Sequence, residues 1–177
     1  GRSDEGFVMV SRRRSTVLVM LLGVTTLLVA TLVTPNYRIL YNASDSAPRG
    51  WYALIPAREV SIGILVFVRL PPHVRELAAE RGYLPRSVLL LKHVAANSGQ
   101  SVCSRSDLIV IEGQPVGRVL TRDGAGRPLP HWKQCRSLEP DELFLLGGDN
   151  PASFDSRYFG PVNVASVVGE AIPLWTW

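Results

Sequence analysis

A long uncharged stretch near the N-terminus constrains this chain more than any other feature. No charged residue occurs for 23 positions between Arg14 and Arg38, and residues 15–34 are mostly Val, Leu and Thr. A helix needs about 20 mostly apolar residues to cross the hydrocarbon layer of a bilayer, and threonine hydroxyls can hydrogen-bond to carbonyls of their own helix. We therefore predict a transmembrane anchor over residues 15–35, which ends at Pro35.

The residues that flank this stretch predict its orientation. Arg12, Arg13 and Arg14 directly precede it, and positively charged flanks stay on the cytoplasmic side. We therefore expect residues 1–14 to form a cytoplasmic tail and residues 36–177 to form a domain outside. A cleaved secretory signal and a buried core helix are the alternatives. The apolar run is longer than a usual signal core and lacks a good small-residue cleavage site, and the arginine flank argues against a core helix.

Composition limits the class of protein to which the chain belongs. With 46% hydrophobic and 19% charged residues, the 177-residue chain can bury enough apolar surface to fold, which excludes intrinsic disorder. Its 15 Gly, 13 Pro and 2 Cys exclude collagen-like and disulfide-dense scaffolds. A formal net charge of +4 is too mild to indicate a nucleic-acid partner, and we predict none.

The cysteines leave two interpretations open. Cys103 and Cys135 are the only two, and a domain outside the cytoplasm permits a disulfide between them. Such a bridge would stabilise the fold by about 3.5–4 kcal/mol in the chain-entropy model, and two buried free thiols are the alternative. The sequence has neither a C-x-x-C pair nor a cluster of His and Cys. We therefore predict no zinc site, no other metal and no cofactor.

Short apolar runs separated by Gly, Pro, Asp and Asn predict a mainly β, antiparallel fold. Five segments have the composition of strands: residues 62–70, 87–95, 107–111, 142–146 and 162–172. Residues 73–81 place apolar and charged side chains on opposite sides of a helix and predict a short insert helix. This helix packs on the sheet or, alternatively, forms a lip of a substrate groove. Residues 118–130 have the composition of a surface loop.

A turn after the uncharged stretch holds the first candidate for chemistry. Ser44, Asp45 and Ser46 precede Pro48 and Gly50, and the proline and glycine favour a tight, extended turn over a helix. A serine in such a turn can present its Oγ while its own backbone N–H stays free. An ordinary polar loop is the alternative interpretation.

Lys92 is the second candidate, because lysines are scarce. Only Lys92 and Lys133 accompany 17 arginines, and arginine cannot serve as a base. Alternation along a strand places Lys92 in one row with Val88, Leu90 and Val94. Loss of water in such a row lowers the pKa of an amine, and a base near neutrality needs a fall of about 3 units from about 10.4. A lysine whose head reaches water is the alternative.

A third candidate segment, residues 147–160, follows the strand predicted at 142–146. Its Asp, Asn, Pro, Ser and Gly residues predict a structured turn. Asp155 and Arg157 can form an ion pair of fixed geometry within it. A purely structural turn is the alternative.

Together, the three segments resemble the sequence boxes of type I signal peptidases. The boxes are S-x-P-x-G-x-Y (46–52), L-L-K-x-V-A-A (90–96) and G-D-N-x-x-S-x-D-S-R-x-x-G (148–160). The form of the first box is similar to that of the conjugative-transfer branch, the TraF-type peptidases that mature pilin precursors. Three departures from the general enzymes favour this branch. They are Ala47 in place of Met, Gln100 in place of Asp, and Pro151-Ala152 in place of a longer charged insert.

The resemblance implies the catalytic roles. Ser46 would be the nucleophile, and Lys92, neutral in its apolar row, would be the general base of a serine–lysine dyad. The Ser44 hydroxyl and the Ser46 backbone N–H would form the oxyanion hole.

The resemblance also implies supporting residues. Ser153 would orient the Lys92 amine, and Asp155 and Arg157 would brace the loop that carries Ser153. A Ser/His/Asp triad is the rival arrangement. Against it, the sequence lacks a G-x-S-x-G elbow, and alternation places His93 on the opposite strand face from Lys92.

The function implied by this resemblance is that of a membrane-anchored serine endopeptidase with a signal-peptidase-like β domain. It would cross the bacterial inner membrane once, with its N-terminus in the cytoplasm and its catalytic domain in the periplasm. Its partners would be membrane lipid, conjugation-machinery proteins and an exported pilin-like precursor, cut after small residues such as Ala. Attack by the pilin's own N-terminus on the acyl-enzyme would give a cyclic subunit. A general leader peptidase and a non-enzymatic anchored scaffold of a conjugation or secretion complex are the alternatives.

Overall fold

The computed structural model describes residues 4–32, 38–148 and 150–177, with side chains for all of these except 4–14 and 30–32. The chain divides into two compact units, residues 1–36 and 37–177, and each is described by itself.

The N-terminal unit is described as helix α1 (Asp4–Leu32). The Thr26 hydroxyl donates to the Leu22 carbonyl at 2.7 Å, as expected for a threonine in an apolar helix. Within the part of the chain that the structure describes, no helix is both long and apolar enough to cross a membrane. The anchor over residues 15–35 stays a prediction, and its residues 33–35 lie outside the described residues.

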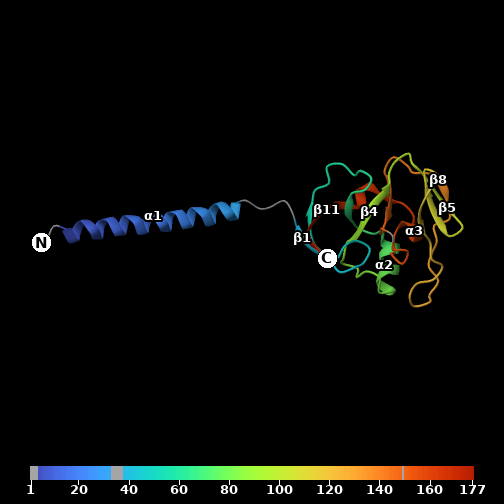
Figure 1. Cartoon of the computed structure of the whole chain (residues 1–177), viewed down its shortest axis with the longest axis horizontal. Coiled ribbons are helices and arrows are strands. Elements are labelled where there is room, and N and C mark those ends of the chain that lie inside the picture. The colour runs from blue at the N-terminus through green and yellow to red at the C-terminus, as the bar shows by residue number, and fades with distance from the viewer. Residues whose placement is uncertain (1–3, 33–37, 149) are drawn as a thin grey trace. The chain divides into compact units, whose positions relative to one another are not determined.

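The second unit is built on antiparallel sheets (Figure 1). Seven strands form the larger sheet: β1 (Arg38–Asn42), β2 (Gly50–Ile55), β3 (Leu65–Val68), β4 (Leu90–Ala96), β9 (Glu142–Leu146), β10 (Val162–Asn163) and β11 (Val167–Thr176). Their order across the sheet is β1-β2-β11-β3-β4-β9-β10. The smaller sheet contains β5 (Ser101–Arg105), β6 (Leu108–Ile111), β7 (Gln114–Arg118) and β8 (Cys135–Ser137) in the order β7-β6-β5-β8. The helical elements described in this second unit are α2 (Pro72–Glu80), α3 (Ser156–Phe159) and the 3-10 turn η1 (Val164–Ser166).

The prediction of a mainly antiparallel β fold with a short insert helix is confirmed. Strand β9 coincides with the predicted strand 142–146, and α2 lies one residue before the predicted helix 73–81. The predicted strand 162–172 is broken because the Asn163 side chain accepts a hydrogen bond from the Ala165 N–H and starts η1. The predicted strand 62–70 is shorter because Gly63, at φ 88°, turns the chain before β3 begins.

Strand β4 begins later than predicted, which changes the row around Lys92. Val88 lies in a turn, where its N–H donates to the Pro85 carbonyl at 3.0 Å, and its side chain is exposed. The prediction that Val88 belongs to the apolar row of Lys92 is therefore wrong. Leu90 and Val94 are buried, however. The row remains apolar because β4 lies between β3 and β9 in the large sheet.

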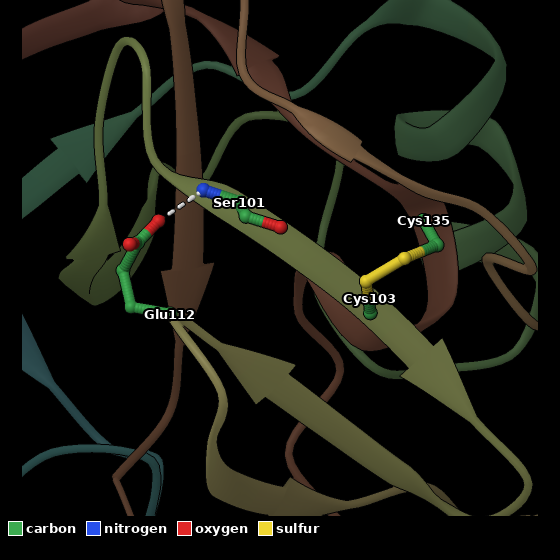
Figure 2. The surroundings of a disulfide bond; sticks show 4 residues. All are labelled: Ser101, Cys103, Glu112 and Cys135. Atoms are coloured by element: carbon green, nitrogen blue, oxygen red, sulfur yellow. Dashed lines mark hydrogen bonds between the residues drawn. A yellow bond between two sulfur atoms is a disulfide. The ribbon is translucent and has the colours of Figure 1, made fainter.

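A disulfide joins two strands of the smaller sheet. Cys103 of β5 and Cys135 of β8 are direct partners in the strand register, and their sulfur atoms are bonded (Figure 2). On the other side of β5, the Glu112 carboxylate accepts a hydrogen bond from the Ser101 N–H. These contacts hold β5 to both of its neighbouring segments.

Candidate active site

The turn between β1 and β2 carries Ser46 and is held from both ends. The Asn42 amide, at the end of β1, is 6% exposed and donates to three carbonyls of the turn, those of Ser44, Ala47 and Pro48. From β2, the Tyr52 hydroxyl donates to the Pro48 carbonyl at 2.6 Å. The turn that the proline and glycine predicted is thus fixed by two side chains of the flanking strands.

Ser46 is buried at the base of this turn, with 8% of its surface exposed. Its Oγ lies 2.9 Å from the Ser44 Oγ. Within the described residues, the backbone N–H of Ser46 donates no hydrogen bond to the protein. A free N–H and a second hydroxyl beside a serine Oγ are the donors that an oxyanion needs.

The Lys92 amine is removed from water by the large sheet. Lys92 is 3% exposed, and its Nζ donates to the Ser153 Oγ at 2.8 Å. Burial lowers the pKa of Lys92 to about 8, with Asp155 opposing the shift and Arg157 adding to it. A charged ammonium is disfavoured in such surroundings because it loses hydration. A useful fraction of the amine is therefore neutral near physiological pH.

The loop that carries Ser153 is braced by a buried ion pair. The side chains of Asp155 and Arg157 are 0% and 1% exposed, and Asp155 Oδ2 lies 2.7 Å from Arg157 Nη2. Arg157 also donates to the carbonyls of Asn150 and Ser153 at 2.7 and 3.3 Å. Asp155 caps α3 and accepts a hydrogen bond from the Gly147 N–H at 2.8 Å. The pair thus ties both ends of the loop to the end of β9.

The absence of a side chain at Gly147 lets the turn that carries Ser46 and the loop that carries Ser153 approach each other. A Cβ atom at this position would lie 1.9 Å from the Ser153 Oγ and 3.0 Å from the Ser46 Cβ. Ser46 and Ser153 therefore flank the same point, and Lys92 reaches that point through Ser153. Gly147 and Ser46 also line a cavity of about 430 Å³, together with Asp45, Ala47, Pro48, Arg49, His93, Gly148, Asn150 and Trp177.

The structure brings residues of all three sequence boxes together. Ser46 and Gly148 line this cavity, and the buried Lys92 is hydrogen-bonded to Ser153, which lies against Gly147. Within the described residues, no hydrogen bond joins Ser46 directly to Lys92. His93 lines the same cavity as Ser46, but no hydrogen bond between the described residues joins a histidine to Ser46. His93 Nδ1 lies 3.2 Å from the Gly63 carbonyl oxygen, and His131 Nε2 lies 2.7 Å from the Ser104 Oγ. In the same described ranges, no group of three or more His, Cys, Asp or Glu side chains could hold a metal ion.

Sequence reasoning missed two residues that shape the site. Asn42 lies four residues before the nucleophile candidate, where a polar residue in a short strand gives no signal of burial. Gly147 was part of a predicted turn, but only the approach of Ser46 and Ser153 shows why a side chain has no room there.

Comparisons with known proteins yield a family model and several similar relatives. A family model described as signal peptidase, peptidase S26, matches residues 11–176. The chain is 31% identical over 175 residues to a probable conjugal transfer protein TraF of Sinorhizobium fredii, covering 89% of this chain and 90% of the relative. It is 36% identical over 153 residues to a conjugal transfer protein TraF of Agrobacterium fabrum, with 80% and 84% covered. A plasmid transfer protein TraF of Escherichia coli is 29% identical over 145 residues, with 77% and 82% covered.

Among solved structures, a signal peptidase I from Enterococcus faecalis matches 64% of this chain and 97% of its own, with a TM-score of 0.38 and 20% identity. No conclusion about the fold rests on a likeness of that degree. The family model, in contrast, spans nearly the whole sequence, and the relatives are covered over most of their length. The chain belongs to the peptidase S26 family of signal peptidases.

Proposed function

We propose that this chain is a serine endopeptidase in which Ser46 is the nucleophile and Lys92 is the general base. One observation carries the proposal: the buried Lys92 amine is bound to Ser153, and Ser153 and Ser46 both border the position that a Gly147 Cβ would occupy. The free Ser46 N–H and the adjacent Ser44 hydroxyl support it, because both can donate to an oxyanion. Membership of the signal peptidase family supports the same reaction class.

The proposed reaction uses these groups in two steps. Ser46 Oγ attacks the substrate carbonyl carbon and its proton passes to the neutral Lys92 amine, while the developing oxyanion accepts hydrogen bonds from the Ser46 N–H and the Ser44 hydroxyl. The carbon–nitrogen bond then breaks, and the Lys92 ammonium returns the proton to the leaving amine. The resulting ester on Ser46 is resolved by water or by an amine, with Lys92 again taking the proton of the attacking group.

The proposed substrate is an exported precursor of the pilin class, cut after small residues. Similarity to proteins named for conjugal and plasmid transfer supports this choice. We place the catalytic domain on the periplasmic side of the bacterial inner membrane, tethered through residues 15–35, because three arginines precede that stretch. Membrane lipid and conjugation-machinery proteins are its proposed neighbours there.

Replacement of Ser46 with alanine should abolish peptide cleavage. The measurement is turnover by the full chain, in detergent micelles, of a quenched fluorogenic peptide with Ala at the first and third positions before the cut. Removal of a nucleophile lowers kcat by a factor on the order of 10⁶ in a well-studied serine protease. Ser61→Ala, which changes an exposed loop serine, is the control and should retain full activity. Undiminished cleavage by Ser46→Ala would reject Ser46 as the nucleophile, whereas absence of cleavage by the wild-type chain would favour the scaffold alternative.

The mass of a processed pilin precursor separates the two fates of the acyl-enzyme. Resolution by the amino group of the same pilin chain gives a mature product lighter by one water than the linear form. Mass spectrometry of the product therefore supports cyclisation if that water is missing. A linear mass supports hydrolysis instead, and cleavage of many unrelated exported precursors would favour a general leader peptidase.

A further inference from the structure

The hydrogen bonds of Asn42 fix which end of its buried amide is the oxygen. One end lies 3.1 Å from the backbone N of Ser44, so that end must accept and is Oδ1. The other end faces the carbonyls of Ser44, Ala47 and Pro48 at 3.0, 3.1 and 3.1 Å, so it must be the donor Nδ2. The orientation of this amide is therefore determined by its partners alone.

This orientation sets the direction of the hydrogen bonds between the two serines. Ser44 Oγ lies 2.8 Å from Asn42 Oδ1, which carries no hydrogen, so Ser44 is the donor. A serine hydroxyl has one hydrogen, and Ser44 already donates its hydrogen to Asn42 Oδ1. The 2.9 Å contact between Ser44 Oγ and Ser46 Oγ must then have Ser46 as its donor. In the free protein, the nucleophile thus points its proton to Ser44, and Ser44 points its proton to Asn42.

The same bonds hold Ser44 where the reaction needs it. An unrestrained serine hydroxyl samples three staggered rotamers, and only a rotamer beside Ser46 lets it reach the oxyanion. The bond to Asn42 keeps the Ser44 oxygen 2.9 Å from the nucleophile before substrate arrives. A charged oxyanion is a stronger acceptor than a neutral amide oxygen. The Ser44 hydrogen can therefore turn from Asn42 to the oxyanion as the Ser46 proton passes to Lys92.

We propose that Asn42 is a positioning residue for peptide cleavage, which acts by holding the Ser44 hydroxyl beside the nucleophile. The inference rests on the proposed function and adds a residue outside the sequence boxes of the family. Asn42 lies on β1, before the first box begins, and within the proposed reaction it touches neither substrate nor the reacting atoms.

The test is a double-mutant cycle in the full chain, read by kcat and KM on the fluorogenic peptide described above. Asn42→Ala should lower kcat about tenfold and leave KM within about twofold, because the loss is of oxyanion stabilisation rather than of substrate binding. Ser44→Ala should lower kcat by about 10²-fold. With the Ser44 hydroxyl gone, the Asn42 amide still binds the turn carbonyls but has no oxyanion donor left to hold, so the double variant should stay within about threefold of Ser44→Ala. Tyr52→Phe is the matched control, since Tyr52 braces Pro48 without touching Ser44. Its small effect should multiply with that of Ser44→Ala.

A full tenfold loss from Asn42→Ala in the Ser44→Ala background would overturn the proposal, because Asn42 would then act independently of Ser44. If Asn42→Ala fails to fold, Asn42→Asp takes its place, since one carboxyl oxygen still accepts from Ser44 and the protonated second oxygen can still donate to the turn carbonyls that Nδ2 binds. Its kcat should stay within about threefold of wild type, and a tenfold loss would contradict the proposal. Failure of both variants to fold would make Asn42 purely structural and also reject it. Absence of cleavage by the wild-type chain would instead reject the proposed function, and this inference with it.

Discussion

Replacement of Lys92 with methionine is expected to lower kcat for peptide cleavage by about 10³-fold or more while the chain stays folded. A general base contributes about 10²–10⁴-fold, and the other lysine, Lys133, is not among the described residues that line the Ser46 cavity. Methionine has a similar length and fits an apolar row, so the large sheet should keep its packing. The measurement is turnover of the fluorogenic peptide by each variant, at equal concentrations of folded chain.

Lys133→Met is the matched control for this prediction. Lys133 is the other lysine of the chain, and its side chain is exposed in the segment before β8. Its replacement should leave kcat within about twofold, because a surface substitution away from the site changes little. Equal activity of Lys92→Met and the wild-type chain would reject Lys92 as the general base.

The same substitution should stabilise the fold at neutral pH. The pKa of Lys92 is lowered from 10.5 to about 8 in the folded chain, so the unfolded chain binds more protons between these values. The free energy of unfolding of the wild type should then rise with pH across this window. At pH 7 the buried ammonium costs about 3 kcal/mol, and methionine removes that cost but leaves the Ser153 hydroxyl without its donor. We expect a net gain of about 1–2 kcal/mol at pH 7, measured by urea unfolding, and a smaller gain at pH 10.

Replacement of Asp155 with asparagine should destabilise the fold by about 3–5 kcal/mol. The substitution leaves the Arg157 guanidinium, 1% exposed, without its counter-charge, and removal of one partner from a buried ion pair typically costs this much. It also removes the charged acceptor that caps α3 and binds the Gly147 N–H. Urea unfolding at neutral pH measures the effect.

Glu76→Gln provides the matched comparison for the ion pair. Glu76 and Arg86 lie 2.7 Å apart, similar to Asp155 and Arg157, but their side chains are 45% and 63% exposed. Water screens such pairs, so its loss should change the unfolding free energy by less than about 1 kcal/mol. A similarly small effect of Asp155→Asn would contradict the view that this pair braces the Ser153 loop.

The sequence predicted the parts of the fold that carry a strong periodic signal. The apolar run 142–146 is a buried strand, and the charged and apolar pattern after Pro72 is a helix. Strands β1, β2, β5, β7 and β8 were missed because they contain polar residues, Gly or Pro, which weaken the apolar signal of a strand. Such strands form because neighbouring strands supply hydrogen bonds and cover, which depend on contacts distant in the sequence.

The candidate site also contains residues that the sequence predicted and residues that it did not. Residue types and spacing pointed to the turn that carries Ser46, to Lys92 and to the Asp155–Arg157 pair, and the family resemblance added the role of Ser153. The roles of Asn42 and Gly147 depend on residues that are near them only in the folded chain. The Asn42 amide matters because the turn folds over it, and Gly147 matters because Ser46 and Ser153 both lie close to it. Neither condition is visible in one sequence.

Direct titration of the Lys92 amine by NMR tests the central claim, which is that burial lets this amine lose its proton near pH 8 rather than near 10.5. The full chain, labelled with ¹³C and ¹⁵N in its two lysines and kept in detergent micelles, gives two lysine signals, and Lys133→Arg leaves that of Lys92 alone. The account predicts that this signal titrates with a midpoint near 8, and that kcat/KM for the fluorogenic peptide rises through the same pH. A midpoint near the ordinary lysine value of about 10.4, or activity that does not follow the titration, would contradict the account.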